Sequence, residues 1–71
     1  MERSKRISTE IGEVVIWLVQ HNRALTRGNV IDALEWKRRA MVDVIRADIL
    51  RDAAVLIREG GKIVGGFSGL N

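Results

Sequence analysis

The sequence predicts an all-α protein in which two to three amphipathic helices form a small helical homodimer. The chain of 71 residues contains no proline, and alanine, isoleucine, valine, leucine, glutamate and arginine dominate its composition, as is typical of helical proteins. Apolar residues recur every three or four positions in several segments, which is the spacing of one helix face. A domain this small is marginal alone, and it has no cysteine for disulfides. We therefore expect self-association to complete the core.

The N-terminal residues 1–7 are predicted to form a flexible basic tail, with charges at Arg3, Lys5 and Arg6. Ser8 or Thr9 is the expected cap of the first helix. The apolar stripe of that helix follows at helical spacing and consists of Ile11, Val14, Val15 and Leu18. The run VVIWLV is rich in β-branched residues and is compatible with a buried strand, but the caps and the flanking periodicity favour a helix.

The second helix is predicted to begin at about Thr26, after a turn at QHNRA. Thr26 is a natural N-cap, and Leu25 and Val30 occupy the two positions of a hydrophobic staple. This helix is expected to turn Val30, Ile31 and Leu34 inward. Because there is no glycine or proline between Val30 and Glu59, the sequence leaves two alternatives open: one long helix, or a break near WKRRAM followed by a third helix.

The segment from Val42 to Ile57 has the widest apolar face in the chain, covering about half of the circumference of a helix. Two short helices of the same chain can cover only part of such a face, so we expect this segment to be the main dimer element. The predicted core and dimer interface of the whole chain comprises Ile11, Val14, Val15, Leu18, Val30, Leu34, Ile45, Ile49, Ala53 and Leu56.

Gly60 and Gly61 are predicted to end the last helix. The glycine-rich residues 60–71 are therefore expected to form a flexible C-terminal tail. Residues 8–59 remain as a single helical domain for dimerisation and regulation.

Several classes of function find no support in the residues. The sequence shows no set of side chains for nucleophilic or acid–base catalysis and no cofactor fingerprint. The single histidine is His21, and it has no neighbouring acidic cluster with which to form a metal site. We thus expect neither an enzyme nor a protein with a cofactor, a metal or a small-molecule substrate. The longest apolar run has six residues, from Val14 to Val19, so we expect no membrane association and a cytoplasmic location.

The formal charge of +3 is too small to indicate nucleic-acid binding by itself. Trp17 borders the apolar stripe and is expected in the core, whereas Trp36 is open between the core and a binding anchor. The residues most suited to contact a partner protein or DNA are those of the basic tail and of the cluster after Glu35, namely Arg3, Lys5, Arg6, Trp36, Lys37, Arg38 and Arg39.

The stretch TEIGEVVIWLVQHNRALTRGNVIDAL resembles the AriR/YmgB/YcgZ family of small biofilm and acid-resistance regulators, which are connector proteins of two-component systems. A family motif at the start of the first helix is matched by Ile11, Gly12, Glu13 and Val15, and the second cap by Leu25, Thr26 and Arg27. The stretch DVIRADILR is also similar and follows without a gap. The resemblance covers about residues 9–59, but its identity is low and none of its motifs is specific alone.

The resemblance implies a helical homodimer without enzymatic activity. It also implies a role in biofilm or acid-stress regulation, through a response regulator of an Rcs-type phosphorelay, and DNA binding has been attributed to AriR. This chain departs from AriR in lacking its longer N-terminal extension and in being basic rather than acidic. Ala40, Met41 and Val42 stand where AriR has the polar caps of its third helix.

The first hypothesis is therefore a cytoplasmic, dimeric adaptor that acts by protein–protein interaction. The second is a dimeric DNA-binding transcriptional regulator, including a ribbon-helix-helix type, although KRIST offers only Ile7 for the strand that this fold needs. A third is an antitoxin-like or structural interaction module.

Overall fold

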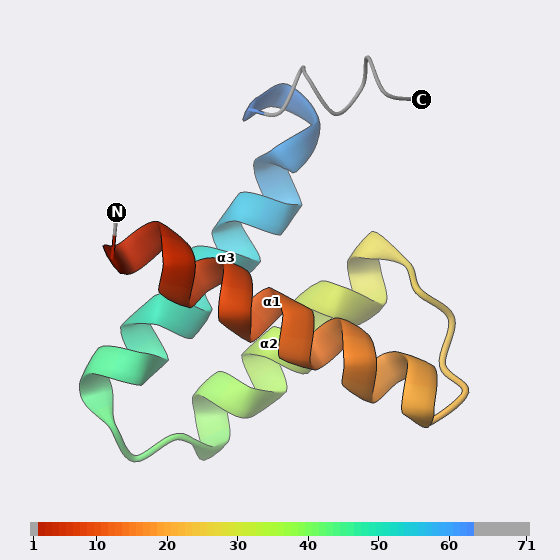
Figure 1. The fold of residues 1–71 in the computed structure, drawn as a ribbon, viewed down its shortest axis with the longest axis horizontal. Helices are drawn as coiled ribbons and strands as arrows, with labels where there is room; N and C mark the ends of the chain where they lie inside the picture. The colour runs from red at the N-terminus through yellow and green to blue at the C-terminus, as the bar shows by residue number, and fades with distance from the viewer. Residues whose placement is uncertain (1, 64–71) are drawn as a thin grey trace.

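A computed structural model describes residues 2–63 as three helices, which confirms the predicted all-α class. Helix α1 spans Glu2–Gln20, α2 spans Arg27–Ala40 and α3 spans Val44–Ile63. In Figure 1, α1 lies across the pair formed by α2 and α3. Each helix contacts the other two, and the contact between α2 and α3 is the most extensive. None of these three helices is both long enough and apolar enough to cross a membrane.

The core lies where the three helices meet. Its buried residues come from every helix and are Val14, Leu18, Val30, Leu34, Ile49, Leu50, Ala53 and Ala54. The alanines of α3 allow the helix backbones to approach closely, while Leu34 and Leu50 fill the centre with no exposed surface. The apolar face of α3, which helices of the same chain were expected to cover only in part, is therefore largely covered by α1 and α2.

Ile45, predicted to lie in the core or the dimer interface, does not belong to the core of the single chain. Ile45 is 64% exposed, whereas Leu50 and Ala54, on the neighbouring row of α3, are fully buried. The buried face of α3 is centred between Leu50 and Ala53, and Ile45 lies about 100° away from that centre around the helix. Of the other predicted residues, Ile11, Val15 and Leu56 are partly buried, and the rest belong to the core.

The prediction of a flexible tail over residues 1–7 is wrong for residues 2–7, because α1 begins at Glu2. Thr9 does not cap the helix. Its hydroxyl donates to the Lys5 carbonyl oxygen one turn earlier, at 2.9 Å, which is the common mid-helix role of threonine. Arg3 forms an ion pair with Asp52 that joins the first turn of α1 to α3. A ribbon-helix-helix arrangement is excluded, since KRIST is helical and not a strand.

The break between the second and third helices is present. Met41 has an extended backbone that ends α2. The Asp43 carboxylate then accepts hydrogen bonds from the amides of Ile45 at 2.9 Å and Arg46 at 3.3 Å. Asp43 therefore caps α3 in place of a threonine or serine.

The predicted helix stop at Gly60 and Gly61 is wrong, since α3 continues to Ile63. A glycine lowers helix stability without forbidding the helical conformation. The remainder of the predicted C-terminal tail, residues 64–71, lies outside the described residues.

Candidate functional site

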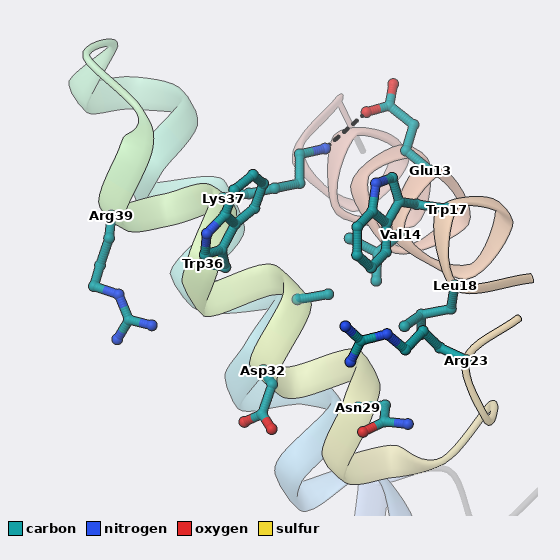
Figure 2. Close-up of a pocket in the computed structure, with 11 residues that line it drawn as sticks. Glu13, Val14, Trp17, Leu18, Arg23, Asn29, Asp32, Trp36, Lys37 and Arg39 are labelled. Carbon is teal, nitrogen blue, oxygen red and sulfur yellow. Dashed lines mark hydrogen bonds and ion pairs between the residues drawn. The ribbon is translucent and has the colours of Figure 1, made fainter. Parts of the chain in front are cut away.

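A groove of about 750 Å³ runs between α1 and α2. Figure 2 shows Trp17 on the α1 side and Trp36 on the α2 side of this groove. The two side chains are only partly covered, with 39% of Trp17 and 62% of Trp36 exposed. Between them the lining is apolar and comes from Val14, Leu18 and Ala33. We call this feature, with its lining residues, the tryptophan groove.

Trp17 is held in place by the end of α1. Its ring stacks on the His21 ring, with centroids 4.2 Å apart and planes 24° from parallel. His21 Nδ1 also lies 2.9 Å from the Trp17 carbonyl oxygen, so this ring nitrogen is the donor of a hydrogen bond. The expectation that Trp17 lies in the core is wrong, because Trp17 is on the flank of the buried stripe of α1.

Arg23 is placed at one end of the tryptophan groove by the turn after α1. Asn22 has a positive φ of 55°, a conformation that asparagine tolerates better than most residues. The Asn22 amide donates to Val19 O at 3.1 Å and the Arg23 amide donates to Leu18 O at 2.9 Å. This pattern is a Schellman motif. The sequence signal for it was the asparagine in QHNRA, which indicated a turn but not which side chain the turn would present.

Beside the groove, two acidic and two basic side chains connect all three helices. Lys37 Nζ donates to Glu10 Oε1 and to Glu13 Oε1, both at 2.9 Å. Arg46 Nε donates to Glu10 Oε2 at 2.7 Å. The Glu10 carboxylate is nearly buried, with 9% of its side chain exposed, so these two cations replace the water that it lacks. We call Glu10, Glu13, Lys37 and Arg46 the ion cluster.

The ion cluster shifts the protonation equilibria of its members. Burial raises the pKa of Glu10, but the hydrogen bonds and charges of Arg46 and Lys37 outweigh that effect and hold the pKa below its usual value. Burial likewise lowers the pKa of Lys37, while Glu10 and Glu13 raise it by more. Both groups are therefore charged at neutral pH and remain paired with each other.

The ion cluster changes the interpretation of the basic sequence KRR. Lys37 is engaged by Glu10 and Glu13, and Arg38 by Glu35 at 2.6 Å. Of the three, only Arg39 forms no ion pair with a side chain of residues 3–60, and it lines the tryptophan groove. The sequence alone did not show which of the three cations is paired, because the two carboxylates that bind Lys37 are 24 and 27 residues away from it.

The basic residues at the N-terminus lie elsewhere. Lys5 and Arg6 are exposed on α1 and border a smaller hollow of about 460 Å³ that also includes Ile45 and Ile49. Arg3 is engaged by Asp52. The structure thus separates the predicted contact residues into two surfaces, with Trp36, Lys37 and Arg39 at the tryptophan groove and Lys5 and Arg6 at the smaller hollow.

No family model, curated protein or solved structure matches this chain.

Proposed function

We propose that this protein is a small, non-enzymatic regulatory adaptor that docks a partner protein in the tryptophan groove. The observation that carries the proposal is Trp36, which is 62% exposed beside an apolar groove although tryptophan is the largest side chain in the protein. Exposed tryptophans next to apolar pockets are the usual anchors of protein–protein interfaces. The low-identity resemblance to the AriR/YmgB/YcgZ family supports a cytoplasmic role in biofilm or acid-stress regulation, with a response regulator of an Rcs-type phosphorelay as the partner.

A homodimer is part of this proposal. Among the side chains that the structure describes, the most exposed apolar ones lie around the start of α3, where Val42 is 94%, Val44 74% and Ile45 64% exposed. Such a cluster is unfavourable in water, and a second copy of the chain would cover it. This assignment narrows the predicted dimer element from the whole segment Val42 to Ile57 to its N-terminal end.

DNA binding is the second candidate function, and one observation favours it: Lys5 and Arg6 are adjacent, exposed cations on α1. Against it, Lys37 and Arg38 are engaged by carboxylates. A phosphate would have to compete with those carboxylates for the same cations. Fewer unpaired lysine and arginine side chains are therefore available to contact a DNA backbone than the net charge indicates.

The test compares two variants of the protein. Trp36→Ala should abolish both the binding of the purified response regulator and the regulatory phenotype. The double variant Arg38→Ala/Arg39→Ala should weaken both less, because exposed charges act mainly on association rate. A gel-shift series at increasing salt measures DNA binding of both variants in parallel. A footprint on a defined promoter at physiological salt, lost when Lys5 and Arg6 are both replaced by alanine and kept in Trp36→Ala, would replace the adaptor with the DNA-binding regulator.

A further inference from the structure

The tryptophan groove has a cationic side chain at each end. Arg23 follows α1 and Arg39 lies in the last turn of α2, and both line the groove. Figure 2 shows the Arg23 guanidinium reaching into the space between the two helices, while Arg39 lies beyond Trp36. Among the side chains of residues 3–60, neither guanidinium has a partner for an ion pair or a side-chain hydrogen bond. Both are therefore available to a carboxylate from outside the chain.

The length of the groove matches that of a short helix. It extends along α2 from Asn29 to Arg39, which is about 15 Å at the rise of an α-helix. About three turns of a docked helix have this length. The small side chain of Ala33 lies within the groove, and helices commonly bind by placing apolar side chains in such a channel between two helices.

The charges of the lining indicate which kind of helix fits. The chain has a net charge of +3, so a second copy offers no excess of carboxylates to the two arginines. A nucleic-acid strand is disfavoured because its phosphates would run along the whole groove past Asp32 and Glu13, whereas a helix can confine its carboxylates to its two ends, beside Arg23 and Arg39. An apolar segment flanked by a few carboxylates matches both the tryptophans and the arginines.

We propose that the occupant of the tryptophan groove is an acidic amphipathic helix of a partner protein. Its apolar side chains insert between Trp17 and Trp36, and carboxylates near its two ends bind Arg23 and Arg39. This inference rests on the proposed function and adds the chemistry of the partner segment. The Schellman motif fixes the Arg23 backbone by hydrogen bonds before the partner arrives, which lowers the conformational cost of forming this contact.

The test uses three synthetic helical peptides that share one apolar face of leucines and differ at the flanking positions, which are glutamate, glutamine or lysine. Trp17 and Trp36 are the only tryptophans of the chain, so their fluorescence reports directly on the groove when the peptides contain none. We expect the glutamate peptide to bind most tightly and to shift the emission to shorter wavelength. Trp36→Ala should weaken its binding by about 30-fold, the effect of a typical anchor residue.

The charge contacts are tested by neutral variants of the arginines. Arg23→Gln and Arg39→Gln should each weaken the glutamate peptide by about two- to five-fold, as for exposed ion pairs, and leave the glutamine peptide unchanged. The matched control is Arg58→Gln, since Arg58 is exposed on α3 away from the groove. It should change neither peptide, and circular dichroism checks that all variants remain folded.

The outcomes distinguish this inference from the proposed function. Equal affinities for the three peptides, with binding still lost in Trp36→Ala, would overturn the acidic partner and retain a protein-docking groove. Binding of the glutamate peptide that is unaffected by Trp36→Ala would show that the peptide does not occupy the tryptophan groove, and would overturn both the acidic partner and the docking function of the groove. Tighter binding of a thymidine oligonucleotide than of the glutamate peptide, with loss in Trp36→Ala, would assign the groove to single-stranded nucleic acid.

Discussion

Replacing Glu10 with glutamine should destabilise the protein, because this carboxylate connects α1 to both other helices. Its side chain is 9% exposed and accepts from Lys37 at 2.9 Å and from Arg46 at 2.7 Å. A hydrogen bond to a charged group contributes about 1.5–3 kcal/mol. Glutamine keeps one acceptor oxygen and places an amide donor against a cation. Lys37 retains Glu13, and Arg46 is 43% exposed to water, so we expect a net loss of about 2 kcal/mol.

The same variant should change how stability depends on pH. The pKa of Glu10 is lower in the folded protein than its ordinary value of 4.5. A carboxyl group of this kind contributes stability that is fully present above the unfolded pKa and is lost as the pH falls through the folded pKa. The free energy of unfolding of the wild type should therefore fall with acidification below about pH 5. The glutamine variant should lack this part of the decline.

Urea denaturation followed by far-ultraviolet circular dichroism, repeated from neutral to acidic pH, measures both effects. Glu59→Gln is the matched control, because Glu59 is exposed on α3 and the substitution is chemically identical. The two variants should differ by about 2 kcal/mol at neutral pH and converge in acid. A Glu10→Gln protein as stable as the control at neutral pH would refute the assignment of the ion cluster as a connection between the helices.

Three further predictions concern stability and association. Ile49→Asp should unfold the protein, because the aspartate would be an unpaired charge at a site that is 3% exposed, and burying such a charge costs several kcal/mol. Ile45→Asp should remain folded but should sediment as a monomer, in contrast to a dimeric wild type. A folded, dimeric Ile45→Asp would refute the proposed interface. Thr26→Ala should lower the free energy of unfolding by about 1 kcal/mol, since the Thr26 hydroxyl accepts from the Asn29 amide at 3.0 Å; an unchanged urea midpoint would contradict this. Gly12→Ala should stabilise the protein by about 0.5–1 kcal/mol, the advantage of alanine over glycine inside a helix, because the added methyl group meets nothing within 4 Å. A lower melting temperature of this variant would show that this face of α1 is covered in solution.

Local sequence signals succeeded where one side chain settles the conformation. The cap at Thr26 was predicted because its hydroxyl and the amide it binds are three residues apart. The same logic failed at Thr9 and at Gly60, where the residue type is compatible with both a helix end and a helix interior. Which of the two occurs depends on whether packing supports the additional turns. For α1 that support includes the ion pair between Arg3 and Asp52, which are 49 residues apart.

By itself, the sequence determined the all-α class, the approximate positions of the helices and most of the core, because helical periodicity is a property of neighbouring residues. Only the tertiary structure decided which groups remain available for binding. In the sequence KRR, Lys37 and Arg39 cannot be told apart as cations. Because α1 crosses α2 and α3, Glu10 and Glu13 lie beside Lys37. Arg39 has no such partner in the described part of the chain. The same crossing places Trp17 and Trp36 on one groove, 19 residues apart in the sequence. The physical reason is that ion pairs and grooves between helices depend on the packing angle, which is set by side chains far apart in the sequence and has no local signature.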